Sequence, residues 1–343
     1  MVKFSCRLSA GLMLASSVLM AAASPSGAAS PLAKEAFSAA REPAAMATRS
    51  IGFYSKGCLA GAATLPIDGP DWQVMRTSRN RHYGHPATVA FVEKLAERAA
   101  REDGWPGLLV GDMSQPRGGP LPYGHASHQI GLDVDIWFRP MPEKRLTVEQ
   151  REDYPFRSVL KKGTFQVDDT IWDKRYAGLV KLAAEDPEVE RIFVHPGIKK
   201  KLCETTRGDR GWLNKVRPYY GHNEHFHVRL SCQPGSDGCK PQASTGTGDG
   251  CGDLGWWFNV ALQPPKPGAK PAKPKPPMRV ADLPAACAAV LAAPSAGGGA
   301  SQPVAVTAPP VPSAAPPAAM FPEAGPVPPL PVAGPRPGAR PSN

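Results

Sequence analysis

Two segments, well separated along the chain, constrain the fold more than any other part of the sequence. The first is GHASHQIGLDVD, from Gly124 to Asp135, and the second is GHNEHFHVRL, from Gly221 to Leu230. Within residues 132–138 and 225–230, apolar and polar side chains alternate, which is the pattern of a β-strand with one buried face. We therefore expect two one-sided strands, each with its polar residues on a single face.

The polar residues of these strands form a set that suits a metal ion. Asp133 and Asp135 share one face of the first strand, and His225 and His227 share one face of the second. If the strands are neighbours in one sheet, Asp135 and His227 can reach one ion, and His128 can join them from the preceding turn. Two imidazoles and one carboxylate leave the fourth tetrahedral position for water, as in catalytic zinc sites. The alternative is a polar cluster without metal.

The other histidines and acids near these strands have open roles. His225 is close enough to His227 to take a proton from the water or to stabilise an oxyanion, or else it is a hydrogen-bonding support. We expect His125 and His222 either to contact substrate or to steady the ligands. Asp133 either orients a ligand histidine or is purely structural.

Outside these segments the functional signals are weaker. His85 and His195, each followed by a proline, are expected to be structural. The basic run of Arg76, Arg79 and Arg81 can bind substrate carboxylates, although a solvated face is the favoured account.

The N-terminal residues 1–29 have the composition of a secretory signal peptide. Lys3 and Arg7 precede an apolar run over residues 8–23, and small residues follow it. No later stretch approaches the roughly 20 apolar residues of a membrane-spanning helix. Of the 7 cysteines, Cys6 leaves with the signal. An even number then remains, which in an exported chain predicts disulfides, although the spacing alone does not fix the pairing.

Composition divides the rest of the chain. Residues 30–49 are predicted to be a loose lead-in, residues 50–291 a catalytic domain, and residues 292–343 a disordered tail rich in proline and alanine. Much of the net charge of +10 lies in the basic proline segment 265–279 and in the tail. For an exported chain this charge favours an anionic wall polymer or membrane surface over nucleic acid, and no nucleic-acid fold signature is present.

Helices and strands alternate inside the predicted domain. Helical patterns cover residues 86–101, 174–185 and 211–216, and strand patterns cover residues 108–110 and 191–194. The two ligand strands are short and one-sided, which favours an antiparallel sheet over a parallel one. The sequence therefore predicts an α+β fold in which a small antiparallel sheet carries the site, flanked by helices and long loops.

The ligand pattern resembles a known group of enzymes. His128-x6-Asp135 followed by His225-x-His227 is similar to the LAS metallopeptidases, which include lysostaphin-type enzymes, D-Ala-D-Ala metallopeptidases and hedgehog domains. More narrowly, the segments WQVMRTSRNRHYGHP, GHASHQIGLDVDIWF, RIFVHPGIKKKLC, KVRPYYGHNEHFHVRLSC and GDGCGDLGWWF resemble the penicillin-insensitive murein endopeptidases. The similarity covers about residues 50–287.

This resemblance implies a periplasmic zinc enzyme with a disulfide-stapled, LAS/hedgehog-like fold that cuts D-alanyl to meso-diaminopimelyl crosslinks in peptidoglycan. His128, Asp135 and His227 match the zinc ligands, His225 matches the catalytic histidine, and His125 and His222 match further active-site histidines. One zinc ion is expected, because residues 157–168 lack the histidine with which some relatives hold a second metal. The implied disulfides are Cys58–Cys287, Cys203–Cys251 and Cys232–Cys239.

Two rival functions remain open at this point. A zinc D,D-carboxypeptidase would trim a terminal D-alanine with the same site, and a zinc-stabilised wall-binding module would bind without turnover. Ser158 and Lys161 spell S-x-x-K, but the partner motifs of serine penicillin-binding enzymes are absent, so this match is interpreted as coincidence. The tail is a candidate contact for a wall-synthesis or hydrolase complex.

Overall fold

The computed structural model describes residues 1, 30–252, 254–265, 268 and 276–297. Residues 2–29 of the predicted signal peptide and residues 298–343 of the predicted tail lie outside these described residues. Among the described residues, no helix has both the length and the apolar character that crossing a bilayer requires.

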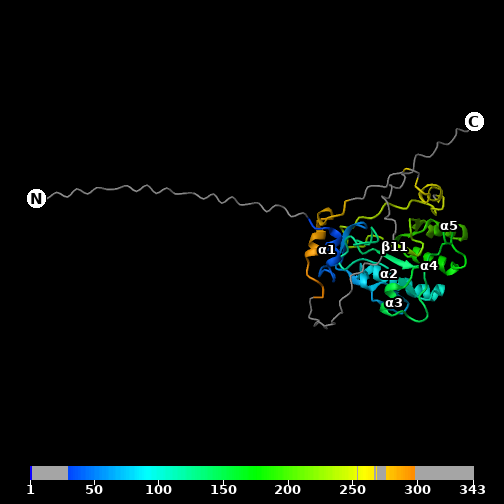
Figure 1. Ribbon diagram of the computed structural model, residues 1–343, viewed down its shortest axis with the longest axis horizontal. Coiled ribbons are helices and arrows are strands. Elements are labelled where there is room, and N and C mark those ends of the chain that lie inside the picture. The colour runs from blue at the N-terminus through cyan, green and yellow to red at the C-terminus, as the bar shows by residue number, and fades with distance from the viewer. Residues whose placement is uncertain (2–29, 253, 266–267, 269–275, 298–343) are drawn as a thin grey trace, which may run out of the picture. The chain divides into compact units, whose positions relative to one another are not determined.

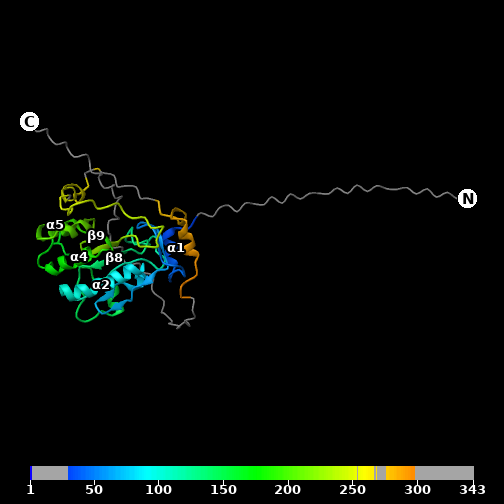
Figure 2. The same cartoon turned by 180° about the vertical axis from the view of Figure 1, so that it is seen from behind.

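A seven-stranded sheet in the order β10-β9-β11-β8-β7-β5-β4 forms the centre of the fold, and β8 and β9 can be followed in Figure 2. The strands are β4 (Asp68–Gly69), β5 (Trp72–Val74), β7 (Leu108–Val110), β8 (Asp133–Trp137), β9 (Val189–Val194), β10 (Val216–Pro218) and β11 (His225–Leu230). The two strands expected to carry the site are antiparallel neighbours, and His227 pairs with Asp135.

The prediction of a purely antiparallel sheet is wrong for two outer pairs. Strands β5 and β7 are parallel, as are β9 and β10. In both cases a helix connects the two strands, α2 (Pro86–Asp103) in the first pair and α5 (Pro196–Thr205) in the second. A parallel pair needs such a crossover connection. The one-sided pattern of β8 and β11 therefore correctly predicted antiparallel pairing at the centre of the sheet, but the sheet as a whole is mixed. The fold class is α+β.

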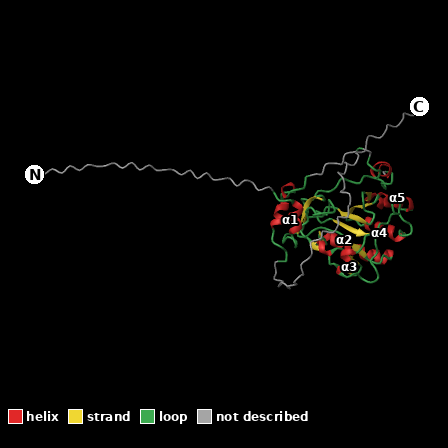
Figure 3. Ribbon diagram, in the orientation of Figure 1, coloured by secondary structure: helices red, strands yellow, loops and turns green. Residues whose placement is uncertain are grey.

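The apolar face of the sheet forms the main core. The inward side chains of β8 and β11 and of the residues beside them are fully buried, namely Leu132, Val134, Ile136, Phe138, Phe226, Val228 and Leu230. Helices α2 and α4 (Lys174–Glu185) pack against this core through their apolar stripes, and Figure 3 shows the helices around the strands. The opposite face of β8 and β11 is left for the polar residues.

The segment expected as a loose lead-in instead contains helix α1 (Ala33–Ala39), marked in Figure 1. Ala33 and Phe37 are fully buried in a second cluster that includes Cys58 and Cys287. The expectation is wrong because only these two side chains anchor the helix, which is too few to produce a periodic pattern in the sequence.

Three disulfides cross-link the fold, over sequence separations of 229, 48 and 7 residues. Cys58–Cys287 links β2 (Lys56–Ala60) to α7 (Ala286–Ala292), across 229 residues of sequence. The other two pairs are Cys203–Cys251 and Cys232–Cys239. All three pairs are those that the family resemblance implies.

Short elements complete the fold. They are β1 (Arg49–Phe53), β3 (Ala63–Thr64), β6 (Tyr83–Gly84), α3 (Val148–Asp153), α6 (Leu254–Trp256), and the short helical turns η1 (Thr77–Arg79), η2 (Gly211–Lys215), η3 (Trp257–Ala261) and η4 (Val280–Asp282). The helix predicted over residues 211–216 is a 3-10 turn that ends at Lys215, because Val216 begins strand β10.

The structural role predicted for His85 and His195 is confirmed. Each residue precedes a helix that begins with proline, and each side chain accepts a hydrogen bond from the backbone N–H two residues later. The donor–acceptor distances are 3.2 Å for His85 and 3.0 Å for His195. These histidines therefore cap α2 and α5.

Candidate metal centre

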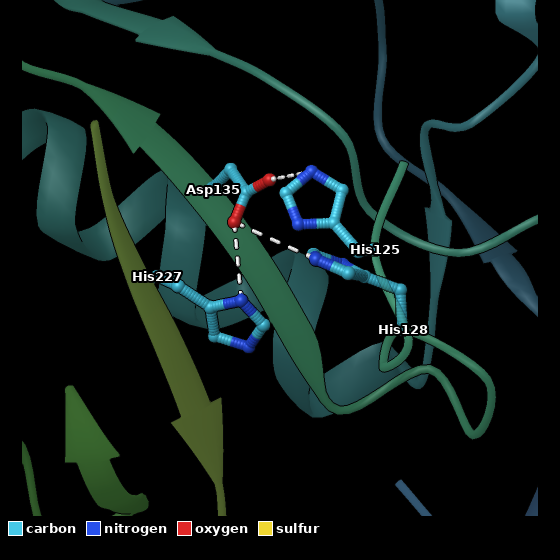
Figure 4. Close-up of side chains that lie close together, drawn as sticks. All are labelled: His125, His128, Asp135 and His227. Atoms are coloured by element: carbon cyan, nitrogen blue, oxygen red, sulfur yellow. Dashed lines mark ion pairs between the residues drawn. The ribbon is translucent and has the colours of Figure 1, made fainter. Parts of the chain in front are cut away.

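Four donor side chains converge above the polar face of β8 and β11 (Figure 4). Each of His125, His128, Asp135 and His227 offers one ligand atom, and these atoms lie within 4.8 Å of one another. Oδ1 of Asp135 is 3.2 Å from Nδ1 of His227 and 3.5 Å from Nε2 of His128, and Oδ2 is 3.0 Å from Nε2 of His125. The strand register explains the first contact, because His227 and Asp135 are cross-strand partners.

His128 reaches the centre through an uncommon backbone conformation. Its φ of 64° lies in the left-handed region, which costs a non-glycine residue of the order of 1–3 kcal/mol and persists only where surrounding contacts enforce it. The backbone N–H of His128 donates to Oδ2 of Asp133 at 3.2 Å, and its carbonyl accepts from Oγ of Ser114 at 2.6 Å. These two contacts fix the turn that aims the imidazole at Asp135.

The donor atoms fit a metal ion. Within the described part of the chain, Nε2 of His128, Oδ1 of Asp135 and Nε2 of His225 are buried and have no hydrogen-bond partner. Buried polar atoms without a partner are costly and therefore rare. Burial alone would raise the pKa of Asp135, but the neighbouring histidines outweigh it and hold that pKa well below the usual range. A carboxylate that stays ionised among imidazoles is a donor set that suits zinc.

Asp133 accepts hydrogen bonds from His227, one of the four donors, and from Arg229. It is fully buried, and its Oδ1 lies 2.7 Å from Nε2 of His227 and 2.7 Å from Nε of Arg229. Because a carboxylate only accepts, Nε2 of His227 carries the proton, and the lone pair of Nδ1 is directed at the other donors. Arg229 is held in turn by Gln242 at 2.6 Å and lies over the Tyr54 ring. This arrangement favours the orienting role for Asp133.

We expect Asp133→Asn to weaken zinc binding by roughly 10- to 100-fold, because the amide no longer fixes the His227 tautomer with a full negative charge. Competition with a chromogenic chelator measures this affinity, and excess zinc should restore most of the metal content. Asp186→Asn is the matched control, since Asp186 is also buried but pairs with Lys94 instead of a site histidine. An unchanged zinc affinity in Asp133→Asn would contradict the orienting role.

His225 lies beside the four donors without belonging to their group. Its Nε2 is 3.8 Å from Oδ1 of Asp135, and its ring centroid is 4.9 Å from that of His222. Burial lowers the pKa of His225, and the charge of Asp135 offsets this only in part. His222 donates from Nδ1 to the carbonyl of Tyr220 at 2.7 Å. Burial therefore favours the neutral form of the His225 imidazole, whose Nε2 lies next to the donors.

A hollow opens on one side of the donors, and we call it the site hollow. It is lined by Met75, Arg76, Arg79, Gly111, Asp112, His125, Asp135, Trp137, Phe156 and His225. Asp112, Trp137 and Phe156 were not predicted to be site residues from the sequence. The position of Asp112 two residues after the end of strand β7 was the available signal for it, whereas nothing local marks Phe156.

The structure corrects the view of the basic run as a solvated face. Arg81 is buried and pairs with Asp112 at 2.7 Å, and Arg79 pairs with the same carboxylate at 3.1 Å. Arg76 is half-buried and lines the site hollow. The basic run lies beside the donors because η1 and the end of β7 bring these arginines close to Asp112. The spacing of the arginines along the sequence does not predict this contact.

Comparisons with known proteins identify relatives of this chain. The model of the penicillin-insensitive murein endopeptidase family matches residues 50–292. A penicillin-insensitive murein endopeptidase of Haemophilus influenzae is 49% identical over 226 residues, which are 66% of this chain and 77% of that protein. Proteins of the same description from Klebsiella pneumoniae and Yersinia enterocolitica are 44% and 43% identical over 251 residues, 73% of this chain and 88% and 87% of theirs.

Proposed function

The chain belongs to the penicillin-insensitive murein endopeptidase family, and from this we propose that it hydrolyses D-alanyl to meso-diaminopimelyl crosslinks of peptidoglycan with one zinc ion. The proposed ligands are His128, Asp135 and His227, on a LAS/hedgehog-like fold. The observation that carries the proposal is the convergence of their donor atoms, some buried without any partner. A periplasmic location follows if residues 1–29 act as a signal peptide.

His128, Asp135 and His227 would hold the zinc ion, which would supply Lewis-acid chemistry at the scissile carbonyl and would lower the pKa of water to near neutral. Nε2 of His225 is the proposed acceptor of that proton, and it then passes the proton to the leaving nitrogen. Asp133 keeps Nδ1 of His227 free of a proton. The amide C–N bond breaks without an acyl-enzyme, so a carboxylate and a free amine are the products.

His125 is proposed as a supporting residue at the mouth of the site. It is the most exposed of the four donors, with a quarter of its side chain accessible, and its Nε2 also lies 4.0 Å from Asp112. Four permanent protein ligands would close the coordination sphere, as in structural zinc sites, whereas three leave a position for water. The three-ligand set is therefore the one that supports hydrolysis.

A serine mechanism has no comparable support. Oγ of Ser158 accepts from Nδ2 of Asn223 at 2.9 Å and from the backbone N–H of Leu160 at 3.1 Å. These contacts give Ser158 a local structural role and explain the S-x-x-K match without chemistry. We accordingly propose that penicillin leaves the activity unchanged.

Digestion of purified muropeptides tests the function and separates the rivals. We expect the zinc-loaded protein to convert D-alanyl to meso-diaminopimelyl dimers into monomers, with or without penicillin. Loss of D-alanine from pentapeptide monomers, with dimers left intact, would instead establish a D,D-carboxypeptidase. Binding to the wall polymer without any cleavage would establish a non-catalytic module. We also propose that the predicted tail, residues 292–343, contacts a wall-synthesis or hydrolase complex.

A further inference from the structure

Arg76 is held in the wall of the site hollow by its backbone and by two aromatic rings. It precedes η1 with φ 52° and ψ 51°, a left-handed conformation that is uncommon for a residue other than glycine. The carbon at the centre of its guanidinium lies 4.2 Å from the Phe156 ring centroid and 5.6 Å from that of Trp137. All three residues line the site hollow together with His225.

The neighbouring acids leave the Arg76 charge without a direct partner. In the described part of the chain no carboxylate lies within 4.0 Å of its guanidinium nitrogens, and its buried Nε has no hydrogen-bond acceptor. Asp112 is already shared by Arg79 and Arg81. Glu152 accepts from Thr77 and Ser78.

The surroundings of Arg76 are therefore those of a receptor for an anion. Burial lowers the pKa of Arg76, and the charge of Arg79 lowers it further. The carboxylates of Asp112, Glu224 and Glu152 offset this only in part. Half-buried charge of this kind is stabilised when an anion with matching hydrogen-bond acceptors enters. A guanidinium can hold a carboxylate through two parallel hydrogen bonds.

We propose that Arg76 binds a carboxylate of the substrate peptide, namely the one on the carbon that bears the leaving nitrogen. This inference rests on the proposed function. In a D-alanyl to meso-diaminopimelyl crosslink, that carbon carries the free carboxylate nearest to the scissile bond. Arg76 and His225 line the same hollow. When the scissile bond lies beside His225, the carboxylate nearest to that bond is therefore the one within reach of Arg76.

Such a contact makes the enzyme selective for crosslinks in which the carboxyl group beside the leaving nitrogen is free and not amidated. A crosslinked dimer whose corresponding carboxyl is amidated keeps the scissile bond but loses the negative charge. A charge-assisted hydrogen bond is worth roughly 10- to 100-fold in an equilibrium or rate. We expect the zinc-loaded wild-type protein to cleave the free-carboxylate dimer with a kcat/KM higher than that for the amidated dimer by about this factor.

Arg76→Gln tests this selectivity, measured as kcat/KM on both dimers. We expect the variant to lose roughly 10- to 100-fold on the free-carboxylate dimer and less than about 3-fold on the amidated dimer, so that the preference disappears. Arg76→Lys keeps the charge and should retain part of the preference. Arg139→Gln is the matched control, because Arg139 also lies over a ring, that of Tyr154 at 4.0 Å, but does not line the site hollow.

Each outcome of this experiment decides something different. Equal losses on both dimers in Arg76→Gln would assign Arg76 a structural role and overturn the inference, as would a preference that survives the substitution. Either result leaves the proposed function intact, since the wild-type protein still cleaves crosslinks. If the wild-type protein cleaves neither dimer, the proposed function itself fails, and the inference falls with it.

Discussion

His225→Ala is expected to lower kcat for crosslink hydrolysis by about 10²- to 10⁴-fold while the protein still binds zinc. Nε2 of His225 is buried without a hydrogen-bond partner and lies 3.8 Å from Oδ1 of Asp135. The substitution removes the proposed proton acceptor, which takes part in the reaction itself. It leaves the proposed zinc ligands His128, Asp135 and His227 in place, so zinc should still bind. Cleavage of purified muropeptide dimers gives kcat, and elemental analysis of the same preparation gives the zinc content.

His85→Asn is the matched control for this prediction. It also removes a histidine, but His85 caps helix α2, and asparagine can take over the cap. We expect this control to cleave dimers at close to the wild-type rate. If His225→Ala also cleaves them at that rate, the proposed role of His225 is wrong. If it loses zinc together with activity, His225 belongs to the ligand set instead.

Asp135→Asn is expected to remove both the metal and the activity, with a loss of at least about 10³-fold in dimer cleavage, because metal Lewis-acid chemistry contributes several kcal/mol to the rate. Asp135 provides the carboxylate that all four neighbouring histidines approach, with distances between 3.0 and 3.8 Å. Its amide analogue is a weaker ligand with almost the same shape. Zinc content and cleavage are measured together after dialysis against a limited zinc concentration.

The same Asp186→Asn control shows whether loss of any buried carboxylate has this effect. We expect that control to keep its zinc and its rate. A variant Asp135→Asn that retains zinc at the wild-type affinity would place the metal elsewhere. A variant that loses zinc but still cleaves dimers would contradict a metal-dependent mechanism.

The strands that carry the site could be predicted from the sequence because their pattern is local. Alternation in residues 132–138 and 225–230 assigns successive side chains to opposite faces of the sheet. The main core contains the apolar side chains of one face, whereas Trp137 packs in a separate cluster. Once β8 and β11 pair, His227 must lie opposite Asp135 or slip by two residues. The sequence placed His128 in the turn before β8, but not the left-handed backbone conformation that aims its imidazole at Asp135.

Other parts of the site depend on contacts between residues far apart in the sequence. The sequence presents Arg76 as one member of a basic run, and only the fold separates it from Arg79 and Arg81 by giving those two a shared carboxylate. Phe156 reaches the site hollow from a loop after α3. Alternation and residue spacing carry no information about such contacts, which is also why helix α1 and the parallel pairing of the outer strands were not predicted.

A zinc titration of metal-free protein tests the central claim most directly, with bound zinc and dimer cleavage measured on the same samples. We predict that cleavage is absent at the start, rises in proportion to bound zinc, and is complete at about one ion per chain. Cleavage at the full rate by protein that holds no metal would contradict the account.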